Sequence, residues 1–378
     1  MGISLPLASV VEPAEAGETE GCIQCQQGSK LVLFVTGHCH WQCDYCPLSE
    51  NRREVDVMFA NERPCHDLDE VIEEARAMRA TGTGITGGDP LMARERSLEA
   101  ISRLKAEFGP EHHIHMYTSI PFPPRHAAEF AAVGLDEIRF HLLDLELGRY
   151  LKTMQACSDA GLLTGVELPA EPDKQVELAA VVEALRDAAV EFLNLNELEI
   201  TVGNQDGMEL RGFNISDELT AGAEGSAELA SLLKRRVDAA NAGLPDPESG
   251  EVRTPYGYHL KFCTSSYKDA GQLRARFARR AQATLRAWEQ ISDDDTILFG
   301  ALYTSQSDSI AHMDELRVLL GLAPGWMEWN PTAERIELPL AIAEEFCEEF
   351  ALPCALVEVH PTHERLEVGL VWLNEQRP

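Results

Sequence analysis

Three cysteines stand close together near the N-terminus, in a spacing that suits a metal centre. Cys39, Cys43 and Cys46 are separated by three and by two residues. A structural zinc ion takes four ligands, usually as two separate pairs, and this spacing does not show two pairs. Three thiolates on one short loop suit a cubane iron–sulfur cluster, which normally takes four cysteines. With only three local thiolates, one iron would keep an open position at which a substrate or cofactor can bind. Tyr45 would place an aromatic ring beside that position.

These residues resemble the CxxxCxφC motif of the radical S-adenosylmethionine (radical SAM) superfamily, in which Tyr45 occupies the aromatic position. A second element, Gly87-Gly88-Asp89-Pro90, stands where that family usually has Gly-Gly-Glu-Pro, so Asp89 is one methylene shorter than expected. The resemblance implies a [4Fe-4S] cluster whose open iron chelates the methionine part of SAM. It also implies cleavage of SAM to methionine and a 5′-deoxyadenosyl radical that abstracts hydrogen. A small electron donor such as ferredoxin or flavodoxin would reduce the cluster.

Other residues are weaker candidates for holding SAM, because they are polar and follow predicted strands. Gly87 and Gly88 would allow close backbone approach to a zwitterion. The strand-end candidates are Thr118, Ser119, Glu167, Asn194, Asn196 and Glu197. Arg139 and His141 alternate on one face of a strand, so both should point the same way. Strand-end capping or ordinary polar satisfaction is the alternative for each of these residues.

The resemblance covers about residues 30 to 200, where short apolar runs alternate with amphipathic stretches. The predicted strands are 31–36, 83–86, 113–118, 137–142, 162–168 and 191–200. Helical patterns between them predict parallel strands with right-handed crossovers. The fold class is therefore α/β, with the partial (β/α)6 barrel of the radical SAM family and a small C-terminal α+β domain.

Domain boundaries follow from changes in composition along the chain. Residues 1–20 are polar and predicted to be disordered, and residues 21–291 form the radical SAM core with its extensions. A loop is expected at 241–257, followed by a long helix at about 267–289. After an acidic linker at 292–295, residues 295–378 form the α+β domain. Its predicted strands are 296–303, 326–330, 333–338, 354–360 and 365–373, with helices at 308–320 and 340–350.

A second metal site is a further hypothesis. Cys22 and Cys25 form a tight pair before the first strand, and His259 and Cys263 lie four residues apart much later in the chain. Together they would supply four ligands to zinc or to a second iron–sulfur cluster. Cys65 is an alternative fourth ligand, and ordinary thiols on a flexible segment are the alternative to a metal site. Gly82, Gly84 and Gly87 fit GxGxxG, but no helix follows them as a dinucleotide fold requires.

The chain is strongly acidic, with 63 acidic and 32 basic residues and a formal net charge of −31. Such a field disfavours non-specific binding to nucleic acid or to an anionic membrane. It is typical of a surface adapted to a salty cytosol. Dialysis to low salt should then unfold the protein, and full stability there would contradict this adaptation. One stretch, 261–286, has a net positive charge, which favours either internal ion pairing or an anion-binding surface.

The sequence thus predicts a radical SAM enzyme that resembles the pyruvate formate-lyase activating enzyme group. A glycyl-radical-enzyme activase is one alternative, and the substrate could be a protein, an RNA or a small molecule. A non-catalytic zinc or iron–sulfur interaction module is the alternative from another class. No secretory signal or membrane-spanning run is visible, so we expect a cytoplasmic protein without membrane contact.

Overall fold

The computed structural model describes residues 15, 17–216 and 220–376. The chain forms two compact units, which are described separately. The first holds the described residues up to 273 except 77–79, and the second holds 77–79 and the chain from Arg274 onward. Most of the N-terminal segment predicted to be disordered lies outside the described residues.

The first unit is built on a nine-stranded sheet in the order β3-β2-β1-β4-β5-β6-β7-β8-β9. From β1 to β9 every neighbouring pair is parallel, as expected for a partial barrel. The parallel strands are β1 (Lys30–Phe34), β4 (Gly82–Thr86), β5 (His113–Thr118), β6 (Glu137–Phe140), β7 (Leu163–Ala170), β8 (Phe192–Glu197) and β9 (His259–Cys263). The six predicted strands are all present. Their parallel order confirms the partial barrel.

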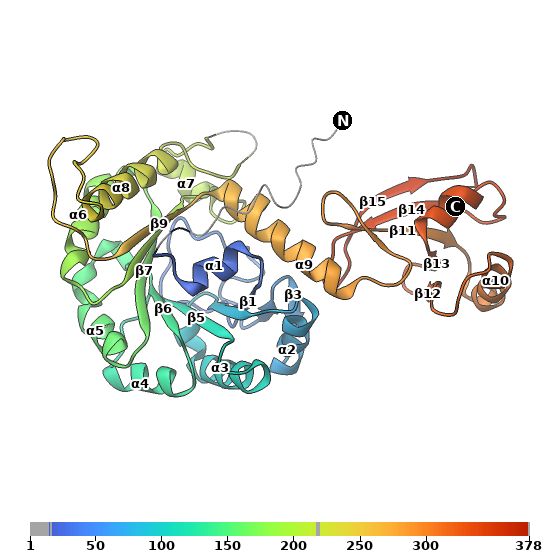
Figure 1. The fold of residues 1–378 in the computed structure, drawn as a ribbon, viewed down its shortest axis with the longest axis horizontal. Helices are drawn as coiled ribbons and strands as arrows, with labels where there is room; N and C mark the ends of the chain where they lie inside the picture. The colour runs from blue at the N-terminus through green and yellow to red at the C-terminus, as the bar shows by residue number, and fades with distance from the viewer. Residues whose placement is uncertain (1–14, 16, 217–219, 377–378) are drawn as a thin grey trace. The chain divides into compact units, whose positions relative to one another are not determined.

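Helices cover the outer side of this curved sheet (Figure 1). They are α2 (Leu68–Ala77), α3 (Arg94–Phe108), α4 (Pro124–Ala132), α5 (Leu151–Asp159), α6 (Gln175–Ala184) and α8 (Ser226–Asn241). The short helix α7 (Gln205–Leu210) lies instead beside the cysteine loop, where Tyr45 packs against the hydrophobic cluster that contains Met208. The start of α2 shows how the sequence sets such a boundary. The Asp67 carboxylate accepts hydrogen bonds from the backbone N–H groups of Asp69 and Glu70, at 2.9 and 3.0 Å. This is the expected N-terminal cap.

Several elements of the first unit were not predicted. The short helix α1 (Glu20–Gln26) lies on the inner side of the sheet, and Thr19 caps it by accepting from the Cys22 N–H at 3.2 Å. An antiparallel hairpin, β2 (Met58–Ala60) and β3 (Arg63–Cys65), extends the sheet beside β1. The 16-residue helix α8, just before the loop expected at 241–257, was not predicted either. Residues 20–26 are therefore helical rather than a flexible segment.

The second unit is an antiparallel sheet with helices, which agrees with the predicted α+β domain. Its strands are β10 (Gln290–Ile291), β11 (Ile297–Tyr303), β12 (Glu328–Asn330), β13 (Arg335–Leu338), β14 (Cys354–Val359) and β15 (Glu367–Trp372). The helices α10 (Gln306–Leu319) and α11 (Leu340–Phe346) follow β11 and β13. The helix α9 (Arg274–Thr284) belongs to this unit, because its Ala281 packs in a core with Trp288 and Phe299. The unit thus begins earlier than the acidic linker at 292–295.

The basic stretch 261–286 is engaged within the protein. Lys261 pairs with Glu18, and Lys268 with Glu199 at 2.6 Å. In the second unit, Arg274 pairs with Asp295 at 2.7 Å, Arg280 donates to the Pro361 carbonyl at 2.9 Å, and Arg286 pairs with Glu337 at 2.9 Å. Internal ion pairing therefore accounts for much of this positive charge. A bilayer-spanning helix is absent from the described residues.

Candidate active site

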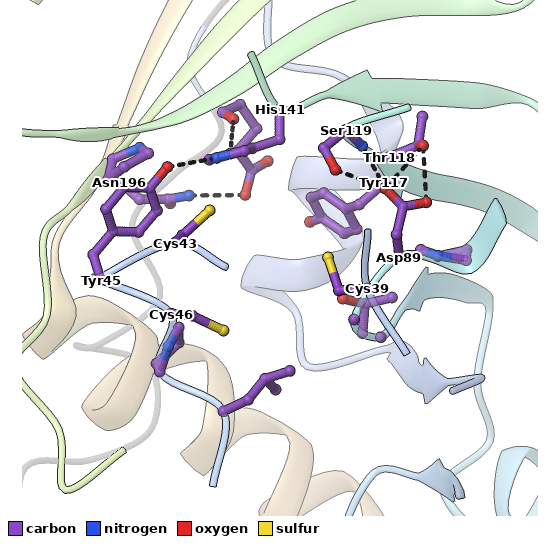
Figure 2. A pocket seen from close by; sticks show the side chains of 18 of the residues that line it. Cys39, Cys43, Tyr45, Cys46, Asp89, Tyr117, Thr118, Ser119, His141 and Asn196 are labelled. Carbon is purple, nitrogen blue, oxygen red and sulfur yellow. Dashed lines mark hydrogen bonds between the residues drawn. The ribbon is translucent and has the colours of Figure 1, made fainter. Parts of the chain in front are cut away.

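A cavity of about 550 Å³ extends through the first unit and is lined by residues at the carboxyl ends of the parallel strands. Figure 2 shows the side chains of Cys39, Cys43 and Cys46 around one open space. The structure brings together most of the residues predicted for the cluster and SAM, whereas the candidates Asn194 and Arg139 do not line the cavity. The lining includes Cys39, Cys43, Tyr45, Cys46, Gly87, Gly88, Asp89, Thr118, Ser119, Glu167 and Asn196.

The cysteine loop is held from both sides by backbone and side-chain contacts. The Cys46 N–H donates to the Cys43 carbonyl at 3.1 Å, which makes a tight turn between these two ligands. Arg53 donates to the carbonyls of Cys46 and Gly203, both at 2.9 Å. One guanidinium therefore joins the loop after β1 to the loop after β8. This contact helps fix the spacing of the thiols.

Gly87 and Gly88 are required by the protein backbone itself. A Cβ on Gly87 would lie 2.5 Å from the Thr36 carbonyl oxygen, and one on Gly88 would lie 2.3 Å from the His38 carbonyl oxygen. The Gly88 N–H already donates to Thr36, at 2.8 Å. We expected these glycines to let a zwitterion approach. Their close contact with the chain leading to Cys39 supplies a second reason, which depends on long-range pairing and is invisible in the sequence.

Asp89 anchors the end of β5, and its side chain is 1% exposed. One carboxylate oxygen accepts from the Leu91 N–H at 3.0 Å and from the Thr118 hydroxyl at 3.0 Å. The other accepts from the Ser119 N–H at 2.7 Å and the Ser119 hydroxyl at 2.8 Å. The dashed lines in Figure 2 show this arrangement. The shorter side chain thus binds the protein, and it fixes Thr118 and Ser119 at the cavity wall.

Tyr45 is joined to His141 across the cavity. The Tyr45 hydroxyl lies 2.7 Å from His141 Nε2, and His141 Nδ1 lies 3.3 Å from the Glu167 carbonyl oxygen. Burial lowers the pKa of His141, and this effect exceeds the opposite effect of its hydrogen bond to Glu167. Burial raises the pKa of Tyr45. Both groups are therefore neutral, so Nδ1 donates to Glu167 and Nε2 accepts from Tyr45. His141 thus faces the cavity, as expected for a residue that contacts SAM or the substrate.

Glu167 lies at the centre of a buried polar network. Its carboxylate accepts from Arg139 at 2.8 Å, from Asn194 at 3.0 Å and from Asn196 at 2.9 Å. Burial opposes its charge, but Arg139 and the two amides outweigh burial and keep the pKa of Glu167 below its usual value. Arg139 also pairs with Glu137 at 2.5 Å. Arg139 therefore positions the wall of the cavity, whereas Glu167 and Asn196 line it.

The floor of the cavity contains three residues that were not among the predicted site residues. They are Lys30, His115 and Tyr117, and Cys25 of α1 lies beside them in the lining. Lys30 Nζ lies 2.6 Å from His113 Nδ1, and burial lowers the pKa of Lys30 to about 8. His115 and Tyr117 alternate with Ile114 and Met116 along β5. Polar residues at every second position of a buried strand were the signal that could have identified them.

The predicted second metal site is not assembled as one group. Among the described residues, no three His, Cys, Asp or Glu side chains converge on a single metal ion, and this includes Cys39, Cys43 and Cys46, which would each bind a different iron of a cluster. For the second site, a zinc ion would need its four ligands to converge. Cys22 contacts Asn194 and Arg139, each at 3.5 Å, whereas Cys25 faces the cavity. Metal analysis of the Cys22→Ala, Cys25→Ala double variant would test whether these thiols bind iron or zinc.

The Tyr45–His141 contact should be measurable as a coupling. Tyr45→Phe removes a hydroxyl whose hydrogen bond contributes about 1 kcal/mol. His141→Leu removes the same bond, so the two substitutions together should cost less than the sum of their separate effects. We expect a coupling of about 1 kcal/mol in the free energy of unfolding from denaturant titration. Strictly additive effects would show that the hydrogen bond contributes nothing.

The chain belongs to the radical SAM superfamily. The family model described as "Radical SAM superfamily" matches residues 33–146, which include the cysteine loop, Asp89 and His141. A Methanocaldococcus jannaschii protein, provisionally named a glycyl-radical enzyme activating enzyme, is 33% identical over 369 residues. The match covers 92% of this chain and 91% of that relative. The similarity therefore extends over both units.

Solved structures to which the chain is similar include two of the Streptococcus suis protein SuiB. The SuiB structure bound to S-adenosylmethionine is 16% identical, with a TM-score of 0.41, and the match covers 62% of this chain and 50% of SuiB. A second SuiB structure is 13% identical, with a TM-score of 0.42, and covers 71% and 54% respectively.

The donor set fits the cofactors of this family. Three thiols line one cavity on a single loop, so they can each bind a different iron of a [4Fe-4S] cluster. When bound, the cluster and SAM supply a 5′-deoxyadenosyl radical that abstracts hydrogen. The protein provides the shaped cavity, the polar wall at Thr118 and Ser119, and the positioned Tyr45. The chain is thus a radical SAM enzyme, and the interaction-module alternative is set aside.

Proposed function

We propose that this enzyme is an activase that abstracts a hydrogen atom from a backbone glycine of a partner protein. The observation that carries the proposal is the full-length similarity to the relative provisionally named a glycyl-radical enzyme activating enzyme. In the proposed step, the Cα–H bond of glycine breaks and a C–H bond forms at C5′ of the deoxyadenosyl group. One electron from a reductant cleaves SAM beforehand, which releases methionine.

Exposed apolar side chains near the cavity support a protein partner. Trp41 follows β1 and is 39% exposed, and Met92 follows β4 and is 48% exposed. Val202 and Leu210 follow β8 and are 97% and 89% exposed. In a parallel sheet these loops all lie at the carboxyl edge, where the cysteines are. Apolar groups gathered on one surface are typical of a protein-binding site.

Charge supports a protein over an RNA. Glu54, Glu197 and Glu199 line the cavity, and their carboxylates would repel phosphate groups. Lys268, a basic side chain of the cavity lining, pairs with Glu199 at 2.6 Å. An RNA substrate would have to displace this ion pair.

A small electron donor such as ferredoxin or flavodoxin is part of the proposal. The cysteine loop lies at the surface, where His40 and Trp41 are exposed, so a donor can approach the cluster closely. Ten cysteines, all free in the structure, are compatible with a reducing compartment. The cytoplasm, as the compartment that holds such donors, is the proposed location.

The experiment uses hydrogen transfer into SAM. Source cells are grown on glycine deuterated at Cα, and their extract is separated into macromolecules and small molecules. The reconstituted, reduced enzyme is supplied with SAM and each fraction, and 5′-deoxyadenosine is analysed by mass spectrometry. We expect the macromolecular fraction to stimulate 5′-deoxyadenosine formation and to transfer one deuterium atom into it.

Two treatments and one variant provide the controls. Protease should abolish the stimulation, ribonuclease should leave it unchanged, and the Cys43→Ala variant should give no product with any fraction. Stimulation by the small-molecule fraction alone, or by a ribonuclease-sensitive component, would contradict the proposed partner. Product without deuterium would contradict glycine as the hydrogen donor.

A further inference from the structure

The sheet of the second unit ends in an unprotected strand. In the strand order β12-β13-β11-β14-β15, β15 has a single neighbour, and no other strand in the described part of the chain pairs with it. Natural edge strands are usually protected by proline, lysine or a cover. The six residues of β15, Glu367-Val-Gly-Leu-Val-Trp372, contain no proline and no basic residue. The register shift opposite Glu358 and Val359 limits the regular edge to Gly369–Trp372.

The direction of the free backbone groups follows from the ladder. The Leu373 N–H donates to the Cys354 carbonyl at 2.8 Å. Antiparallel ladders alternate, and Leu356 pairs with Val371, so the backbone of Val371 and Gly369 points toward β14. The N–H and C=O groups of Leu370 and Trp372 therefore point away from the sheet. They offer an extended chain a place to add as another strand.

Apolar side chains on both faces accompany this edge. Leu370 is 40% exposed on the face of Val357, and Val371 is 55% exposed on the face of Leu356. Leu366 and Val368 are 62% and 46% exposed. A β-strand presents alternate side chains to opposite faces, so an added strand would cover apolar groups on both. Covering them would add apolar burial to the main-chain hydrogen bonds.

The surroundings of β15 are acidic. The sequence from Thr296 to Pro378 contains 14 acidic and four basic residues. Two of the basic side chains are already paired, Arg335 with Glu367 at 2.7 Å and Arg365 with Glu289. Glu358 of β14 lies opposite Gly369, and Glu364 precedes β15 by three residues in the chain. A basic chain segment is therefore the electrostatic complement of this edge.

A second copy of this protein fits less well. It would bring two acidic units together, and an edge of four residues buries far less than the roughly 1,200 Å² of a stable interface. We propose that β15 binds an extended segment of a partner protein, with basic residues alternating with apolar ones, by strand addition. This inference rests on the proposed function, because that function requires a protein partner. The edge of β15 would recruit that partner.

The test uses the full-length protein and a defined probe. A fluorescent decapeptide in which lysine alternates with valine is titrated with the protein, and its anisotropy is measured. Leu370→Pro removes an outward N–H and places a ring in the path of the added strand, a position at which an edge strand tolerates proline. We expect wild-type binding to be weakened about tenfold or more by Leu370→Pro.

Leu370→Ala is the matched control, because it also shortens the side chain but keeps the N–H. It should weaken binding only a few-fold. A peptide with N-methylated valines should lose binding, and a glutamate–valine peptide should not bind. The SAM cavity lies in the first unit and β15 in the second, so folding of the second unit is checked by itself. Leu370→Pro should keep the wild-type circular dichroism spectrum and the wild-type number of cooperative thermal unfolding transitions.

Three results would overturn the inference. They are equal binding by the proline and alanine variants, equal binding of the N-methylated peptide, or a wild-type dimer that Leu370→Pro converts to a monomer. The last result would assign the edge to a second copy. Peptide binding needs neither cluster nor SAM. A failure here is therefore distinguishable from the failure of glycine hydrogen transfer in the extract experiment.

Discussion

The Cys43→Ala variant is expected to purify without the [4Fe-4S] cluster and to form no 5′-deoxyadenosine above background. Cys43 is the middle cysteine of the three and lines the cavity. Its carbonyl oxygen accepts a hydrogen bond from the Cys46 N–H at 3.1 Å. Removing one of three thiolates leaves two ligands for a cluster that needs at least three. Iron and sulfide content after anaerobic reconstitution, with the visible absorption spectrum, measures the loss.

Cys65→Ala is the matched control for this experiment. Cys65 is another buried thiol, 7% exposed, and it does not line the cavity. Its Sγ lies 3.5 Å from the Arg63 carbonyl oxygen. The variant should retain the cluster and SAM cleavage. Retention of full iron by Cys43→Ala, or its loss from Cys65→Ala, would show that the ligand set is assigned incorrectly.

The Asp89→Asn variant is expected to be strongly destabilised although it preserves the shape of the side chain. Each carboxylate oxygen accepts from a backbone N–H, one from Leu91 and one from Ser119. Whichever way the amide turns, its NH2 group must therefore face a buried N–H donor. The cost of such an unsatisfied pair is about 2–4 kcal/mol in the free energy of unfolding. Denaturant titration measures it.

The same substitution should also impair catalysis, because Asp89 holds Thr118 and Ser119 at the cavity wall. We expect SAM cleavage to fall by about tenfold or more, since small displacements of positioning groups are costly. Thr118→Val removes only one hydroxyl donor to the carboxylate and should cost about 1 kcal/mol. Equal stability of Asp89→Asn and wild type would contradict the anchoring role of the carboxylate.

The chemistry of the site could be predicted because its determinants are local. The spacing of Cys39, Cys43 and Cys46 predicts the ligand set without any knowledge of the fold. The alternation of buried strands and helices predicted the parallel sheet. The α+β character of the second unit was also predicted, because its turns and periodic runs are short-range signals.

The remaining features depend on contacts between distant parts of the chain. Gly88 is required by the His38 carbonyl, and Asp89 binds Ser119 thirty residues away. No local pattern reports such contacts. The helix α1 has only seven residues, too short for periodicity to identify it. By contrast, Leu229, Leu233 and Val237 do repeat at helical spacing in α8, so that helix was predictable.

The most direct test of the central claim is the cleavage of SAM by the wild-type protein. The enzyme is reconstituted anaerobically with iron and sulfide, reduced, and supplied with SAM, and both products are quantified by chromatography. The structure and the family predict equal amounts of 5′-deoxyadenosine and methionine, formed only with reductant. A fully loaded, reduced cluster that yields neither product would contradict the assignment of this cavity as a radical SAM active site.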